Sequence, residues 1–228
     1  MKLGGVMLGA LAIAGWLIPL ASFSAPAGAH TPPAFVRQLE YEPPAPGTYP
    51  LPVIMSAVDG DILDSDGTRR RLFEVLGNGI ALLSFVYTSC SDADGCPLAT
   101  YVMRQVAAYI DEQGNLSGQL RIVTLSFDPE RDTPEAMRRY AGESEPAGNL
   151  VFLTTASREV LQPILDGYGQ YIVREPDPAG AFGGGYSHIL KVFLIDRHKR
   201  VRNVYSVSFL YPQIIINDVK TLMMQKKG

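Results

Sequence analysis

Two cysteines and one histidine are the residues of this sequence best suited to chemistry. Cys90 and Cys96 lie within Tyr87–Pro97, between an apolar run and a segment that opens with proline. Thiolate is the nucleophile of disulfide exchange and the ligand that soft Cu(I) prefers. His188 follows the glycines 183–185, and a neutral imidazole is a good partner for thiolates around copper. The three side chains predict a copper site or a redox pair.

The placement of the cysteines also bears on their ionisation. Pro97 suits the first turn of a helix, and the backbone N–H groups at a helix start favour thiolate. We expect Cys96, next to Pro97, to feel this effect most. An inert disulfide closing a small loop is the structural alternative, although a stabilising disulfide gains more from a long loop.

The histidines have simpler alternatives as well. Taken alone, His188 is an ordinary histidine at a strand edge. His198 lies in the basic segment Arg197–Arg200, where solvation explains it, and His30 lies in a tether. The glycines before His188 are not followed by Lys and Ser/Thr, so they do not form a phosphate-binding loop.

The elements that must position these residues follow an α/β pattern. Short apolar runs predict strands at 80–87, 119–127 and 150–153, then a hairpin of 189–195 and 201–207. Helices are expected at 97–113, from 132–135 onward with Asp132 or Thr133 as cap, at 157–168 and at 212–225. This order predicts an α/β fold, a thioredoxin-like sandwich with an inserted helical unit.

The N-terminal part divides the chain into three regions. Residues 1–29 predict a signal peptide, or an uncleaved membrane anchor, because Lys2 precedes an apolar run and small residues end it. Residues 30–52 contain seven prolines and predict an extended tether. Residues 53–228 then form the folded domain. We expect a periplasmic or other extracytoplasmic location, secreted or membrane-anchored, with membrane contact only through the N-terminal segment if it is uncleaved.

Composition excludes several classes of protein. The chain has 20 basic and 23 acidic side chains without a long run of either sign, so no nucleic-acid surface is indicated. A hydrophobic fraction of 46% suits a globular core rather than disorder. Two cysteines are too few for a disulfide scaffold.

Three blocks of the sequence resemble the Sco/SenC family, in the same order: Phe85–Pro97, Ser126–Pro134 and Tyr186–Asp196. The similarity runs from about Val53 to Met224. The resemblance implies a thioredoxin-like fold in which Cys90, Cys96 and His188 bind copper, with Asp128 as an acidic residue near the site. It also implies delivery of copper to a receiving protein, such as the cytochrome c oxidase subunit with the dinuclear copper centre.

Two departures from the family pattern concern the site itself. Five residues, Ser91–Gly95, separate the cysteines where the family has three, and Ser187 stands where Asp is common. Some members of the family act on thiols. A thiol–disulfide oxidoreductase that reduces partner cysteines, with its own thiol reductant, is therefore the alternative function. A peroxidase is disfavoured because Tyr87 stands where peroxiredoxin-like sequences have Thr or Ser.

Overall fold

A computed structural model describes residues 39–114, 118–142, 148–176 and 185–225. The predicted signal peptide, residues 30–38 of the predicted tether and Gly183 and Gly184 lie outside these ranges. Within the ranges, no helix has the length and apolar character needed to cross a membrane.

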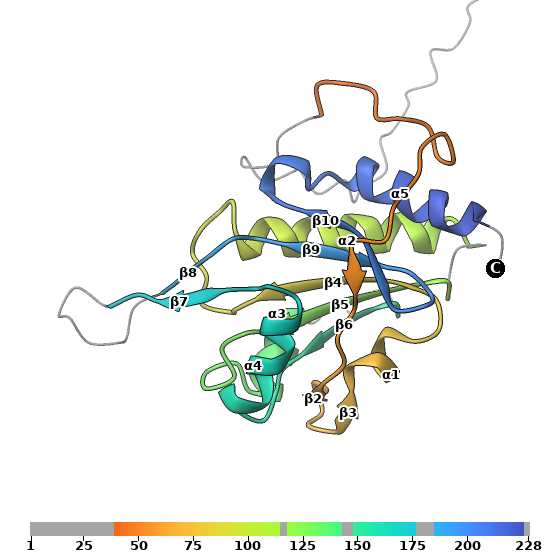
Figure 1. Cartoon of the computed structure of the whole chain (residues 1–228). Coiled ribbons are helices and arrows are strands. Elements are labelled where there is room, and N and C mark those ends of the chain that lie inside the picture. Colours follow the sequence, from red (N-terminus) through yellow and green to blue (C-terminus); the bar gives the residue numbers. More distant parts are fainter. Residues whose placement is uncertain (1–38, 115–117, 143–147, 177–184, 226–228) are drawn as a thin grey trace, which may run out of the picture. The chain divides into compact units, whose positions relative to one another are not determined.

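A six-stranded mixed sheet lies at the centre of the fold (Figure 1). Its strand order is β1–β10–β9–β4–β5–β6. The strands are β1 (Met55–Ser56), β10 (Arg200–Tyr205), β9 (Val192–Ile195), β4 (Ile80–Val86), β5 (Leu120–Ser126) and β6 (Leu150–Leu153). β4, β5 and β6 run parallel, whereas β9, β10 and β1 add antiparallel pairs. The predicted α/β class and the β9–β10 hairpin are confirmed.

Helices cover both faces of this sheet. In Figure 1, α2 and α5 lie on one face and α1 and α4 on the other. The helices are α1 (Leu72–Leu76), α2 (Cys96–Glu112), α3 (Pro134–Ala141), α4 (Arg158–Gly167) and α5 (Pro212–Met224), with a short 3-10 helix at Val207–Phe209. All seven residues of β4 are buried, which explains its unbroken apolar run. Thr133 caps α3 by accepting from the Ala136 N–H at 3.2 Å.

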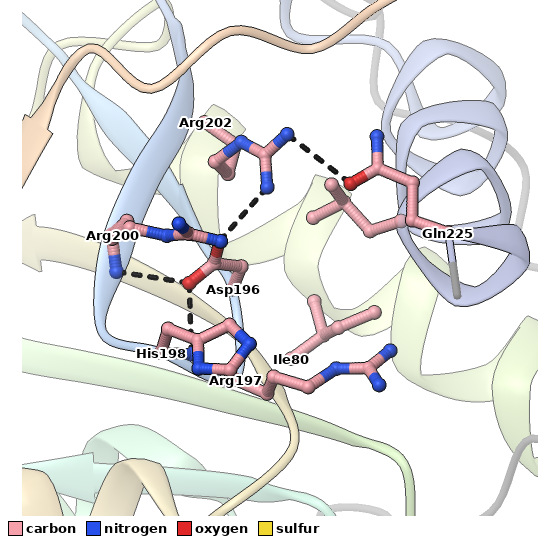
Figure 2. A pocket seen from close by; sticks show the side chains of 8 residues that line it. Ile80, Asp196, Arg197, His198, Arg200, Arg202 and Gln225 are labelled. Atoms are coloured by element: carbon pink, nitrogen blue, oxygen red, sulfur yellow. Dashed lines mark hydrogen bonds and ion pairs between the residues drawn. The ribbon is translucent and has the colours of Figure 1, made fainter. Parts of the chain in front are cut away.

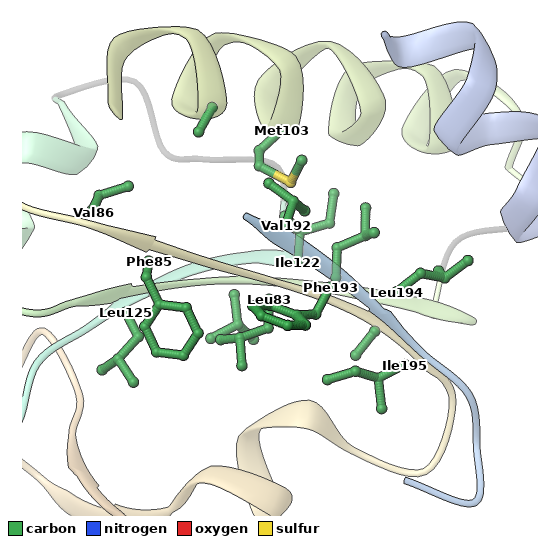
Figure 3. Close-up of a cluster of buried hydrophobic side chains, with 14 of the residues drawn as sticks. Leu83, Phe85, Val86, Met103, Ile122, Leu125, Val192, Phe193, Leu194 and Ile195 are labelled. Carbon is green, nitrogen blue, oxygen red and sulfur yellow. The ribbon is translucent and has the colours of Figure 1, made fainter. Parts of the chain in front are cut away.

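The core packs against both faces of the central strands (Figure 3). Phe85 of β4 and Phe193 of β9 lie with ring centroids 5.9 Å apart, and both contact the Tyr168 ring at the end of α4. Met103 of α2 is fully buried on the opposite side. Close packing on both faces fixes the position and direction of β4, the strand that precedes the cysteines.

Two small hairpins lie outside the main sheet. They are β2–β3 (Asp61–Leu63 with Arg69–Arg71) and β7–β8 (Ile172–Arg174 with Tyr186–His188). Neither hairpin is predicted from the sequence. Three-residue strands carry too little apolar alternation to be distinguished from loops. β8 matters for the site because it carries His188.

The described part of the proline-rich segment contains neither helix nor strand. Residues 44–51 nevertheless lie along β10 and α5. The Tyr49 hydroxyl donates to Asp218 Oδ1 at 2.5 Å, and the Gly47 N–H donates to Thr221 Oγ1 at 2.9 Å. This end of the segment is therefore attached to the domain.

Candidate metal centre

Between the two cysteines, the chain makes a turn over residues Asp92–Gly95. The Asp92 carbonyl accepts from the Gly95 N–H at 2.9 Å, and its side chain accepts from the Asp94 N–H at 3.1 Å. A Cβ at Gly95 would lie only 3.3 Å from Cys90 Sγ, so glycine leaves room for the sulfur. The five-residue spacing thus still allows the two cysteine side chains to interact.

The two cysteines are free thiols in very different surroundings. Cys96 is fully buried as the first residue of α2, whereas Cys90 is half-buried. The Cys96 thiol donates a hydrogen bond to the Cys90 sulfur. This bond, together with those from His188 and from the backbone N–H groups of Cys96 and Asp92, lowers the pKa of Cys90 to about 3. The shared proton and then burial raise the pKa of Cys96 far above its usual value.

The expectation that Cys96 would be the more ionised cysteine is therefore wrong. The helix start does favour a thiolate, but the Cys96 backbone N–H acts on the sulfur of Cys90. The Cys96 sulfur itself is buried, and burial penalises the charged form. Cys90 is the thiolate of the pair.

His188 ends β8, where it pairs with Ile172 of β7. Its ring interacts with the Cys90 sulfur and helps to stabilise the thiolate. The Nδ1 atom of His188 is buried and finds no hydrogen-bond partner among the described residues. Leaving such a group unsatisfied costs about 1–3 kcal/mol, so this nitrogen suits a bond to an incoming ligand or metal.

Aromatic rings enclose the histidine. Phe127 lies 4.9 Å from the His188 ring and Tyr87 lies 6.3 Å from it, centroid to centroid. Tyr186 contacts both Tyr87 and Phe127, at 5.2 and 5.4 Å. Burial raises the pKa of Tyr87 to about 12, and the negative charge of Cys90 adds to the increase.

These rings were not among the residues predicted for the site, although the sequence carries a signal for them. Tyr87 and Phe127 directly follow two parallel strands whose last residues, Val86 and Ser126, are register partners. Aromatic residues at equivalent ends of neighbouring parallel strands must lie side by side. That relation was visible once the two strands had been predicted.

Two buried aspartates hold the surrounding loops. Asp128, expected near the site, accepts from the Tyr186 hydroxyl at 2.9 Å and pairs with Arg131 at 3.4 Å. It therefore reaches the site through Tyr186, two residues before His188. Asp132 accepts from the Thr88 hydroxyl at 2.5 Å and from the Thr88 N–H at 3.0 Å.

Cys90 is the central member of the three candidate ligands, with Cys96 on one side and His188 on the other. In the part of the chain that the structure describes, no three His, Cys, Asp or Glu side chains already converge to hold a metal ion. A metal shared by all three would need these side chains to move closer together. The donor types, two sulfurs and an imidazole, fit a soft or borderline cation such as copper.

Comparison with known proteins places this geometry in a family. The family model described as SCO1/SenC matches residues 61–224. The mitochondrial SCO2 homologue of Danio rerio is 29% identical over 177 residues, which is 75% of this chain and 60% of that protein. The chain thus matches less than two thirds of that relative's length.

Solved structures share the fold. The copper-bound ScoI of Bradyrhizobium japonicum superposes with a TM-score of 0.59 at 21% identity, covering 73% of this chain and 99% of that one. BsSco, described as having a disulfide switch and as a member of the Sco family of cytochrome c oxidase assembly proteins, gives a TM-score of 0.60 at 23% identity. That match covers 76% of this chain and 98% of BsSco.

Proposed function

Because the chain belongs to the SCO1/SenC family, we propose that it is an exported copper-binding metallochaperone. It binds copper with Cys90, Cys96 and His188 and delivers it to a cuproenzyme, namely to the dinuclear copper centre of cytochrome c oxidase. The observation that supports this most is the interaction of the Cys90 thiolate with both Cys96 and His188. The bound copper in a solved relative agrees with it.

The two cysteines would contribute differently to copper capture. Cys90 is already ionised and half-buried, so it can meet an arriving ion first. Cys96 must lose its proton before its sulfur can coordinate, because a thiolate rather than a thiol binds metal. Capture by both sulfurs should therefore release a proton, and the affinity should rise with pH.

The site also suits transfer to another protein. The half-buried Cys90 side is the accessible one, whereas Cys96 and the aromatic rings close the other sides. An extracytoplasmic recipient is consistent with the N-terminal apolar run from Leu3 to Phe23. Whether that run is removed or anchors the protein, the copper domain would face the same compartment.

The most direct test removes the histidine. Copper competition against a chelator should show strongly weakened affinity in His188→Ala, by about tenfold or more, because one of three ligands is lost. His198→Ala is the matched control, since His198 lies in the β9–β10 turn away from the cysteines. Equal copper affinities in wild type and His188→Ala would remove the histidine from the site.

The cysteines are tested in the same titration. Reduced wild-type protein should bind about one copper per chain, with thiolate-to-copper charge transfer in the Cu(II) form. Cys90→Ser and Cys96→Ser should each abolish tight binding. Retention of wild-type binding in both serine variants would refute the ligand assignment.

A thiol–disulfide oxidoreductase is the second candidate, and the unequal cysteines favour it. An accessible low-pKa thiolate beside a buried protonated thiol is the arrangement of an attacking and a resolving cysteine. Such an enzyme would reduce partner disulfides catalytically. Fast turnover that is unaffected by His188→Ala would favour it over the chaperone.

A further inference from the structure

A polar hollow lies at the end of β4 opposite to the cysteines. It has a volume of about 290 Å³ and opens between Ile80 and the turn that joins β9 to β10 (Figure 2). Its charged and polar lining consists of Asp196, Arg197, His198, Arg200, Arg202 and Gln225. β4 spans six residue steps from Ile80 to Val86, so roughly 20 Å of strand separates the hollow from the cysteine loop.

The single carboxylate in the lining is fully engaged. Asp196 Oδ1 accepts from the backbone N–H groups of His198 and Arg200, at 2.9 and 3.1 Å. Its Oδ2 accepts from the side chains of Arg200 and Arg202, both at 2.8 Å. Burial raises the pKa of Asp196, but hydrogen bonds from Arg200, Arg202 and two backbone N–H groups outweigh it and lower the pKa overall, so the carboxylate stays ionised. It has no capacity left to neutralise a third guanidinium.

Arg202 is fixed in the wall of the hollow. Its side chain is only 10% exposed and donates to Asp196, to the Leu51 carbonyl and to Gln225 (Figure 2). The buried guanidinium therefore contributes a stationary positive charge. A positive charge fixed in a low-dielectric wall attracts anions more strongly than one on a mobile surface side chain.

Donors remain free on the open side. Within the described chain, the Arg197 guanidinium and the His198 ring make no hydrogen bond or ion pair, and both line the hollow. Lys199 does not contribute, because it donates to the Gly77 carbonyl and lies over the Phe73 ring. Three guanidinium groups thus face one carboxylate, which leaves an excess of two positive charges around a cavity.

We propose that this hollow binds a phosphate-bearing anion, with Arg197 as the main open contact and Arg200 and Arg202 as its fixed electrostatic wall. Guanidinium groups match phosphate oxygens in bidentate geometry, which favours phosphate over a simple halide. The ligand is a phosphate group, either free in solution or on a lipid headgroup. The site is separate from the copper-binding residues and does not depend on them.

Free phosphate is tested first, by calorimetric titration of the full chain with inorganic phosphate. We expect saturable binding that weakens about tenfold in Arg197→Gln, because a charged hydrogen-bond donor is lost. Arg69→Gln is the matched control, since Arg69 is exposed on β3 and this substitution removes the same charge. Copper affinity should be the same in both variants.

Lipid phosphate is tested by co-sedimentation with vesicles of phosphatidylcholine, alone or mixed with phosphatidylglycerol. The N-terminal run and the other surface charges are the same in both variants, so the difference between Arg197→Gln and Arg69→Gln in the preference for phosphatidylglycerol reports on the hollow. A preference for phosphatidylglycerol that Arg197→Gln removes and Arg69→Gln retains assigns the site to headgroups. Saturable phosphate binding without that preference assigns it to free phosphate. If neither assay separates Arg197→Gln from Arg69→Gln, the turn is only a solvated basic surface and the proposal is wrong.

Discussion

At the scale of single residues, the unequal cysteines decide what the site can do. Cys90 receives hydrogen bonds from the Cys96 thiol, the histidine and backbone N–H groups, all of which stabilise its charged form. Cys96 retains its proton because it donates it to Cys90 and because it is buried. The Cys90 sulfur is therefore the reactive thiolate, and Cys96 is the protonated thiol.

This asymmetry predicts an unusual pH profile for thiol alkylation. Because the pKa of Cys90 is lowered to about 3, its thiolate persists as pH falls from 8 to 5. An ordinary cysteine would have less than about one thiolate in a thousand at pH 5. We expect iodoacetamide to label reduced protein at Cys90 at nearly the same rate at both pH values, measured by mass spectrometry.

His188→Ala provides a control for this profile, because it removes one stabilising contact and should shift the onset of labelling upward in pH. A tenfold fall in rate per pH unit below 8 in the wild type would contradict the low pKa. Labelling of Cys96 in folded protein would contradict its burial.

The sequence identified both cysteines but ranked their ionisation in the wrong order. A helix start at Pro97 correctly implied a thiolate, and the residue types pointed to copper or redox chemistry. The direction of the Cys96 N–H toward the other sulfur depends on the Asp92 turn. The three-ligand copper site itself stays a prediction.

At the scale of elements, Asp132 joins the ends of two parallel strands. It accepts from Thr88, just after β4, and from the Ser126 hydroxyl, the last residue of β5, at 2.5 Å. Asp132 is almost fully buried. The cysteine loop starts two residues after Thr88, so this carboxylate sets where the loop begins.

Asp132→Asn should therefore destabilise the fold by about 2–4 kcal/mol, since the amide nitrogen cannot accept from the donors that face it. Urea unfolding of the wild type and the variant measures the difference. Glu135→Gln is the control, because Glu135 is exposed and its ion pair among the described residues is with Arg139, so its loss should cost little. An equal effect of the two substitutions would mean that Asp132 does not hold the loop.

The longer elements and the four-residue apolar strands β6 and β9 were predictable, whereas the two- and three-residue strands were not. The strands β4 and β5 and the helices α2 and α5 have apolar runs or favourable helix starts, so local sequence determines them. The β3 strand reads Arg69-Arg70-Arg71 and is fully exposed, a composition without any strand signal. It forms by pairing with β2, and that tertiary partner cannot be read from local pattern.

At the scale of the whole domain, Asp218 connects the N-terminal segment to the last helix and the sheet. Its carboxylate accepts from Tyr49 of the proline-rich segment at 2.5 Å, and from Asn203 and Tyr205 of β10 at 2.8 and 2.7 Å. Over the described residues 39–52 of this segment there is neither helix nor strand. Proline content cannot indicate that Tyr49, together with Gly47 and Leu51, attaches the segment to α5 and β10.

Tyr49→Phe should weaken this attachment without disturbing the core. At pH 7 we expect a loss of about 1–2 kcal/mol in the free energy of unfolding, because Asp218 loses one charged hydrogen bond. Burial, followed by the bond to Asp218, raises the pKa of Tyr49 to about 12. The contribution of the hydroxyl is therefore complete below about pH 10 and is lost as pH rises toward 12.

Urea unfolding at pH 7 and pH 11 measures this directly, and the advantage of the wild type over Tyr49→Phe should shrink at the higher pH. Tyr41→Phe is the matched control, because Tyr41 is 54% exposed and should give no difference at either pH. Limited proteolysis should also cut Tyr49→Phe faster between residues 41 and 50. Cleavage and unfolding equal to those of Tyr41→Phe would show that the segment is held by its apolar contacts instead, and that Asp218 serves only β10.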